Sequence, residues 1–238
     1  PVLRTWDINR DEAILASFEE EKPFCVFVID FSQMIGEPFL SMPEPGCLNI
    51  HPSLLPAYRG AAPIQRAIMN GEKETGVTVF RLVGDIDAGP ILISSKAKIG
   101  DEDTFGDMAE ALAVEGSGIA LEGLELFRRG RISFREQLHE KATFAPRISK
   151  RETEIRWEIP SGEVHDLVRS LNPYPGSHFL FQGKRTKLWK TRRGSLEGVP
   201  GEVIDCSDGN PLVACGEGSV ELVEVQAEGR RRTDGASW

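Results

Sequence analysis

The sequence predicts an α/β fold with a mostly parallel sheet, followed by a small β-barrel domain. Phe24–Ile29 (FCVFVI) is a continuous apolar run rich in β-branched and aromatic residues, which suits a strand buried on both faces of a parallel sheet. Beyond Pro175, short strand-like runs alternate with glycines, a pattern typical of a small β-barrel. A chain of 238 residues is long enough for one large domain or two modest ones.

The first half of the chain mixes predicted helices with predicted strands. A helix is expected from about residue 10 to residue 20, with Asn9 and Glu12 as its capping box. A longer helix is expected to begin at residues 103–104 and to continue to Phe127, because its apolar residues recur close to every 3.6 positions. The strands expected between these helices are Phe24–Ile29, Cys47–Ile50, Val77–Val83 and Ile91–Ile99.

The character of the chain changes after the long helix. Little periodicity is visible from Arg128 to about Arg147, so this stretch is interpreted as an interdomain linker. A short helix is predicted over Ser161–Ser170. The strands expected after it are Ser177–Phe181, Thr186–Lys190, Gly201–Ile204, Leu212–Ala214 and Val220–Val225. The predicted division is residues 1–129, a linker of residues 130–147, and residues 148–238.

Charge is unevenly distributed along the chain. The formal net charge is −9, yet residues 128–193 hold 16 lysines and arginines against 7 acidic residues, and both flanking segments are acidic. A basic segment between acidic neighbours indicates a surface that meets a polyanion, although chance clustering of solvated charges is the alternative. The densest positive charges are Arg128, Arg129, Arg131, Arg185, Lys187, Lys190, Arg192 and Arg193.

Several classes of protein are disfavoured by composition. No apolar run approaches the 18 or so residues of a membrane span, and no secretory leader pattern is visible. The four cysteines are scattered without a CxxC pair, which argues against structural disulfides and a zinc site. We therefore expect a cytoplasmic protein that has no membrane contact and no metal.

Three polar residues stand out as candidates for chemistry. Asn49 and His51 alternate at the end of a predicted buried strand, where an open α/β sheet binds its ligands, and Asp87 lies in another polar loop. An Asn amide suits a developing oxyanion, and a carboxylate near an imidazole is expected to raise the pKa of the imidazole above about 6.5. The residues favour acyl-type transfer without a protein nucleophile. Taken alone, each also fits a structural role in a cap or turn.

Several motifs make the chain similar to a known family. The block Asn49–Pro56 (NIHPSLLP) resembles the folate-dependent formyltransferases in general. The extension Tyr58–Gln65 (YRGAAPIQ) resembles a smaller group of these enzymes, the methionyl-tRNA formyltransferases and the related sugar-modifying formyltransferases. Further similarity to the methionyl-tRNA branch lies in DAGPIL (87–92), APRISK (145–150), IRW (155–157), NPYPG (172–176) and KLWK (187–190).

The resemblance implies a fold and a reaction. It implies a nucleotide-binding-type catalytic domain, N-terminally incomplete because the family's first strand, turn and helix are not seen here, and an OB-like C-terminal domain. It implies a catalytic trio of Asn49, His51 and Asp87. It also implies that a 10-formyltetrahydrofolate donor contacts Ser53, Leu54, Leu55 and Pro56. The acceptor would be initiator methionyl-tRNA, met by the eight basic residues named above, and a monomer is expected.

The expected mechanism combines these roles. Asn49 and a protonated His51 would stabilise the oxyanion formed when the acceptor amine attacks the formyl carbon, and Asp87 would support the imidazolium. A cis peptide bond is predicted before Pro56, in the ligand-binding turn. Three alternatives stay open: formyl transfer to an amino sugar or a glycinamide nucleotide, a hydrolase that releases formate, and a non-catalytic RNA-binding fragment.

Overall fold

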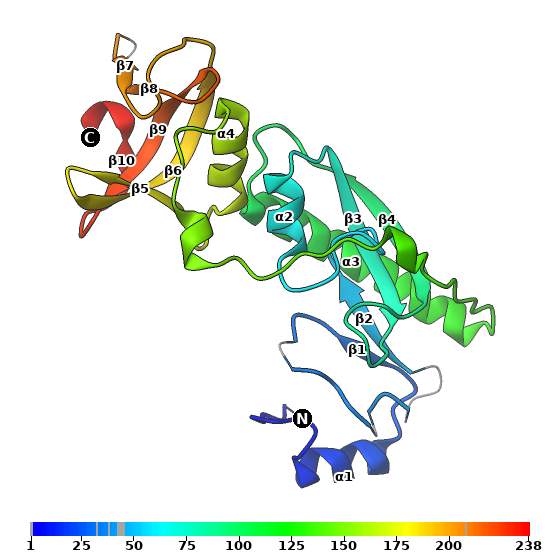
Figure 1. The fold of residues 1–238 in the computed structure, drawn as a ribbon. Coiled ribbons are helices and arrows are strands. Elements are labelled where there is room, and N and C mark those ends of the chain that lie inside the picture. The colour runs from blue at the N-terminus through cyan, green and yellow to red at the C-terminus, as the bar shows by residue number, and fades with distance from the viewer. Residues whose placement is uncertain (1, 32, 38, 42–45, 208) are drawn as a thin grey trace. The chain divides into compact units, whose positions relative to one another are not determined.

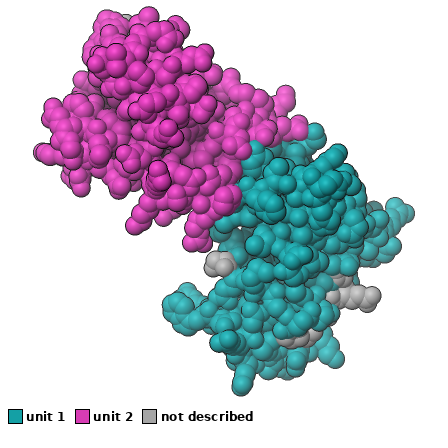
Figure 2. All heavy atoms as spheres, viewed as in Figure 1, with its two compact units in different colours: residues 1–63, 75–97, 111–145 teal, residues 64–74, 98–110, 146–238 magenta. Residues whose placement is uncertain are grey.

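The computed structural model describes residues 2–31, 33–37, 39–41, 46–207 and 209–238. Contacts between backbone positions divide the chain into two compact units (Figure 2). Unit 1 consists of residues 1–63, 75–97 and 111–145. Unit 2 consists of residues 64–74, 98–110 and 146–238. Each unit is therefore built from segments that lie far apart in the sequence.

Unit 1 is organised around a four-stranded sheet in the order β1-β2-β3-β4 (Figure 1). Strand β1 is parallel to β2, and β2 is antiparallel to β3, so the sheet is mixed. Leu48, Val79 and Phe80 are fully buried and form part of its core. The predicted α/β class is confirmed. The strand bounds are β1 Val26–Val28, β2 Cys47–His51, β3 Glu74–Arg81 and β4 Ile91–Lys98.

The predicted cap of the first helix was wrong. Helix α1 spans Glu12–Glu21, and its N-cap is Asp11, whose carboxylate accepts a hydrogen bond from the Ile14 backbone N–H. Asn9 instead closes a neighbouring loop, since its side-chain oxygen accepts from the Gly36 N–H at 2.8 Å. Asn and Asp both cap helices well, so residue type alone does not distinguish Asn9 from Asp11. The bond between Asn9 and Gly36, 27 residues away, distinguishes them.

The predicted long helix is confirmed as α3, Phe105–Arg128. At Gly116 the helix packs closely against the sheet, because a Cβ there would lie 3.0 Å from the Ile50 side chain and 3.3 Å from the Val77 side chain. The absence of a side chain at this position lets the helix backbone come close to β2 and β3. A further short helix, α2 (Pro63–Met69), was not predicted, since seven residues carry too little periodicity to be recognised.

The segment interpreted as a linker lies along unit 1 as far as residue 145. Arg135 and Ile91 exchange two backbone hydrogen bonds, each of 2.8 Å. Arg59 accepts a bond of 2.7 Å from the Ala145 N–H, and a short 3-10 turn, η1 (His139–Lys141), lies between these contacts. As a result, Gln137 is buried although its sequence surroundings are polar.

Unit 2 contains a six-stranded sheet in the order β5-β6-β9-β8-β7, with β10 added to β9, and every pairing is antiparallel. Helix α4 (Ser161–Ser170) has the predicted bounds and packs beside β6 and β9 through Val164 and Val168 (Figure 1). The predicted short helix followed by a series of short strands is confirmed. The strand bounds are β5 Ser177–Phe181, β6 Lys184–Gly194, β7 Val203–Asp205, β8 Leu212–Ala214, β9 Ser219–Ala227 and β10 Thr233–Asp234, and the short 3-10 turns are η2 Lys150–Thr153 and η3 Gly235–Ser237.

Candidate active site

The candidate site is built at the end of strand β2. Register places Asn49 opposite Phe80 and His51 opposite Thr78 on β3. Two residues apart on one strand, Asn49 and His51 direct their side chains to the same face of the sheet. Asn49 is half-buried, and no hydrogen-bond partner for its side chain occurs among the described residues. Its amide therefore retains its donors for a ligand.

His51 and Asp87 meet in the structure. The imidazole Nδ1 lies 3.7 Å from Oδ2 of Asp87, and the two side chains are 7% and 17% exposed. The His51 ring also makes an edge-to-face contact with Phe80, with 6.4 Å between ring centroids. Two of the three predicted catalytic side chains are thus adjacent, and the third, Asn49, lies on the same strand as His51.

The tripeptide Tyr58-Arg59-Gly60 holds both groups through its backbone. The Tyr58 carbonyl is 2.9 Å from His51 Nε2, and the Gly60 N–H donates to Asp87 Oδ2 at 2.8 Å. Gly60 has φ 118°, and a Cβ there would lie 2.9 Å from the Ala145 carbonyl oxygen, so only glycine fits. These backbone roles were not predicted, although the motif containing them was recognised.

The protonation state of His51 differs from the predicted one. A carbonyl oxygen only accepts hydrogen bonds, so Nε2 carries a proton and Nδ1 of the neutral ring has the lone pair. Burial lowers the pKa of His51 below its ordinary value, and this effect outweighs the opposing influences of Asp87 and of the Tyr58 hydrogen bond. The predicted rise in the His51 pKa was wrong because a carboxylate at 3.7 Å does not compensate for the loss of solvation.

The predicted donor-binding residues form a turn after β2. Leu55-Pro56 is a cis peptide bond, which confirms that prediction. Ser53 is fully buried and its hydroxyl donates to the Ala57 carbonyl, whereas Leu54 and Pro56 are half-buried. Thr78 ties the turn to β3, because its hydroxyl donates to the Ser53 carbonyl and accepts from the Leu55 N–H.

The predicted tRNA-contacting residues are divided between the two units. Arg128 is the last residue of helix α3 in unit 1 and Arg129 follows it. Both pair with Glu125, and Arg131 is exposed just beyond them. The other five are Arg185, Lys187, Lys190, Arg192 and Arg193, all on β6 in unit 2. Lys187 is half-buried over the Trp189 ring, and Arg192 pairs with Glu221 at 2.6 Å.

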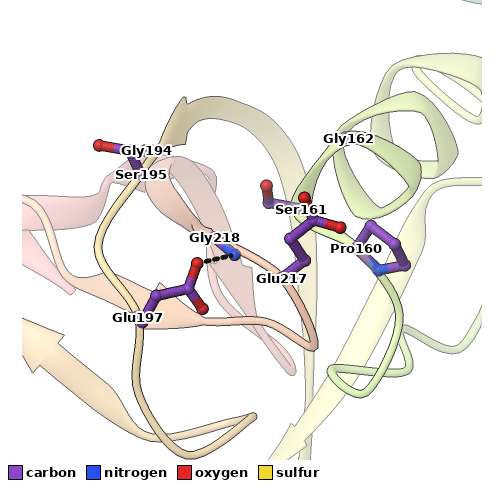
Figure 3. Close-up of a pocket in the computed structure, with 8 residues that line it drawn as sticks. All are labelled: Pro160, Ser161, Gly162, Gly194, Ser195, Glu197, Glu217 and Gly218. Carbon is purple, nitrogen blue, oxygen red and sulfur yellow. Dashed lines mark hydrogen bonds between the residues drawn. The ribbon is translucent and has the colours of Figure 1, made fainter.

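A hollow of about 320 Å³ lies elsewhere, in unit 2 (Figure 3). It is lined by glycine, serine, proline and two glutamates, and Glu197 accepts a hydrogen bond from the Gly218 N–H within it. None of the candidate catalytic residues lines this hollow. We therefore do not assign this hollow to the chemistry.

Comparison with known proteins identifies the family. The model of the family described as "Formyl transferase" matches residues 5–123, and that of "Formyl transferase, C-terminal domain" matches residues 147–238. The chain belongs to the formyl transferase family. Among the formyl transferases it is 39% identical to the methionyl-tRNA formyltransferase of Carboxydothermus hydrogenoformans, over 91% of this chain and 70% of that protein. It is 40% identical to that of Protochlamydia amoebophila, over 89% of this chain and 68% of that protein.

Solved structures show the same fold at lower identity. HypX from Aquifex aeolicus in complex with tetrahydrofolic acid has a TM-score of 0.71 and 22% identity, over 94% of this chain and 39% of that chain. Methionyl-tRNA formyltransferase from Clostridium thermocellum has a TM-score of 0.61 and 22% identity, over 79% of both chains. At these identities the likeness concerns the formyl transferase fold alone.

Two further features are absent from the residues that the structure describes. No group of three or more His, Cys, Asp and Glu side chains in these residues is arranged to hold a metal ion. No helix in the same residues is long and apolar enough to cross a membrane.

Proposed function

We propose that this chain transfers the formyl group of 10-formyltetrahydrofolate to the amino group of initiator methionyl-tRNA. The reaction class is supported by the approach of His51 Nδ1 to the Asp87 carboxylate at 3.7 Å. The acceptor is supported by identities of 35–41% to eight methionyl-tRNA formyltransferases, over 86–100% of this chain.

The side chains divide the chemistry between them. The acceptor amine forms a bond to the formyl carbon, and the Asn49 amide donates to the oxygen that gains charge. His51 Nδ1 accepts the proton that the attacking nitrogen loses, and Asp87 stabilises the resulting imidazolium. When the bond from the formyl carbon to the folate nitrogen breaks, the same proton passes to that nitrogen. Neutral His51 thus acts as a base, which replaces the protonated donor expected from the sequence.

The donor is proposed to bind at the turn of Ser53, Leu54, Leu55 and Pro56. This turn follows His51 directly and is fixed to β3 by Thr78, so a ligand held there lies next to the base. Because the Ser53 hydroxyl is bound to Ala57, the turn would contact a ligand through its backbone and through Leu54 and Pro56.

A formylation assay tests the proposal. The chain is incubated with 10-formyltetrahydrofolate labelled in the formyl group and with initiator methionyl-tRNA, a nucleotide-linked amino sugar, glycinamide ribonucleotide or water alone. We expect label on methionyl-tRNA only, and loss of that label in His51→Gln. Label on the sugar or the glycinamide nucleotide, or release as formate, would favour the corresponding alternative. If no acceptor became labelled and no formate were released, but the chain still bound tRNA, the result would favour a non-catalytic RNA-binding protein.

Further parts of the hypothesis stay predictions. These are the division of function at residues 130–147, a monomeric state and a cytoplasmic location. Size-exclusion chromatography tests the oligomeric state, and cell fractionation tests the location. Separate expression of residues 148–238, followed by a tRNA-binding measurement, tests whether tRNA affinity resides in that part.

A further inference from the structure

We propose that Gln137 is a positioning residue for the catalytic pair: its amide fixes the Asp87 backbone and the Arg59 side chain together, and so sets the Asp87 carboxylate beside His51. The inference rests on the proposed roles of His51 and Asp87. It concerns a residue in the stretch that the sequence marks only as a linker.

Both ends of the Gln137 amide are used inside unit 1. Its Nε2 donates to the Asp87 carbonyl at 2.9 Å and to the Gly89 carbonyl at 2.7 Å. Its Oε1 accepts from Arg59 Nε at 3.1 Å and from Arg59 Nη2 at 2.6 Å. The residue is 4% exposed, so water does not readily replace these bonds when the amide is removed. A single side chain therefore satisfies two carbonyls and two guanidinium donors.

The loop that carries Asp87 depends on hydrogen bonds from outside the loop. Asp87 has φ 48°, in the left-handed region that few side chains other than Asn and Asp adopt readily. The residues just before it are exposed, and Ile86 is 59% exposed. Within the loop, the backbone bond from the Ala88 N–H to the Asp85 carbonyl is long, at 3.5 Å. The two bonds from Gln137 are shorter than this one.

The bonds from Gln137 to Arg59 connect it to the backbone that holds His51. Arg59 is 6% exposed, and among the described residues no carboxylate pairs with its guanidinium. Its acceptors are the Gln137 amide oxygen and, at 3.2 Å, Nδ1 of His139. Its sequence neighbours hold the catalytic pair, since Tyr58 binds His51 Nε2 and Gly60 binds the Asp87 carboxylate. Gln137 thus links the two backbone segments whose spacing sets the distance between His51 and Asp87.

The charged groups around His51 determine how its pKa would change if the bonds from Gln137 were lost. Asp87 is the charged group that faces the ring and favours its protonated form. The Arg59 guanidinium bonds to Gln137 and His139, and Phe80 contacts the His51 ring from β3. If the Asp87 loop is released, the favourable influence of the carboxylate on protonated His51 weakens. The pKa of His51 should then fall further, and the base should lose its partner during proton transfer.

The experiment compares Gln137→Met with a matched variant, Gln33→Met. Gln33 is also a unit 1 glutamine that accepts from one backbone N–H and donates to one carbonyl, but it lies outside the site. The first measurement is the titration of His51 by NMR in the full chain without substrate, which is independent of the acceptor. The second is the rate of formyl transfer against pH at saturating substrates.

For Gln137→Met we expect a lower His51 pKa, an acidic limb of the rate profile moved to lower pH, and a loss in kcat of about ten- to a hundred-fold. Gln33→Met should match the parent chain in both measurements. In an Asp87→Asn background, Gln137→Met should no longer change the His51 titration, because its effect passes through that carboxylate.

A second variant keeps the inference testable if Gln137→Met fails to fold. Gln137→Leu loses both the acceptor for Arg59 and the donors to the Asp87 and Gly89 carbonyls without adding a charge, and we expect the same changes in titration and rate. An unchanged His51 titration and an unchanged rate profile in a folded Gln137 variant would overturn the inference. Because the titration needs no substrate, that result is distinct from a failure to formylate methionyl-tRNA.

Discussion

His51 is held from both sides, with Nδ1 at 3.7 Å from Asp87 Oδ2 and Nε2 bonded to the Tyr58 carbonyl at 2.9 Å. The carbonyl assigns the resting proton to Nε2, so Nδ1 is the basic nitrogen. Asp87 is itself fixed by the Gly60 N–H. In the proposed mechanism, the event that this arrangement serves is the arrival of a proton on Nδ1.

The first prediction concerns Asp87→Asn. The new side chain keeps an oxygen that can accept from the Gly60 N–H, so the midpoint of thermal unfolding should stay near that of the parent chain. Loss of the charge removes support for the imidazolium, and the formylation rate should fall at least about a hundred-fold. Asp85→Asn, in the same loop but exposed, is the control. Near-normal formylation by Asp87→Asn would show that Asp87 has only a structural role in the turn.

The second prediction concerns the pH dependence of stability. The folded pKa of His51 is lowered by burial, whereas the unfolded chain has the ordinary value of about 6.5. As the pH falls below that value, the unfolded state takes up a proton first, so this contribution to the unfolding free energy is complete above it and is lost on acidification. Urea unfolding between about pH 7.5 and 5.5 should show the decline. His51→Gln should reduce the slope, and an equal slope in both proteins would contradict the assignment.

The third prediction concerns Gly60→Ala. With φ 118° and a Cβ that would meet the Ala145 carbonyl at 2.9 Å, the variant should lose about 1–3 kcal/mol of unfolding free energy. Formylation should also fall, since the Gly60 N–H that holds Asp87 must move. Gly130→Ala is matched in having a positive φ, 62°, but has open space around the added Cβ. Equal losses in the two variants would exclude the clash as the cause.

The fourth prediction concerns the basic strand β6. Among the described residues no carboxylate lies within ion-pair distance of Lys190 or Arg193, although the charge of Arg193 helps to lower the pKa of Asp101. Both side chains are exposed and can meet phosphates. Changing both to Gln should weaken tRNA binding and lower the salt slope by about one for each phosphate that the protein no longer neutralises. Folate affinity should stay the same. The matched control changes two exposed arginines outside the basic segment, Arg230 and Arg231, to Gln. An equal loss of tRNA affinity in that control would show that binding responds only to the net charge of the protein.

The fifth prediction concerns Glu152, within unit 2. A hydrogen bond from Arg66, together with bonds from Ser149, lowers the pKa of Glu152 to about 2. This stabilisation is present above the ordinary carboxyl pKa and is lost as the pH falls towards 2. Because the Glu152 side chain is 39% exposed, Glu152→Gln should cost only about 1 kcal/mol or less at pH 7. Urea unfolding should show this difference shrinking at acidic pH, and a constant difference would contradict the pairing.

Local patterns in the sequence were sufficient for most of the elements. The long apolar period of α3, the bounds of α4 and the short strands of unit 2 follow from side chains close together in the chain. Asn49, His51 and Asp87 were singled out by motifs that resemble a known family, and the cis bond before Pro56 was predicted on the same ground. The helices and strands depend on residue type and short spacing, which a sequence displays directly.

Only the tertiary structure decided the state of the site. The pKa of His51 depends on how completely β3 and the Tyr58 segment exclude water, a competition between desolvation and one carboxylate that no local pattern expresses. The role proposed for Gln137 rests on bonds to residues 48 to 78 positions away. The sequence determined which groups are present for formyl transfer, whereas long-range packing determined which nitrogen is basic and what holds the carboxylate beside it.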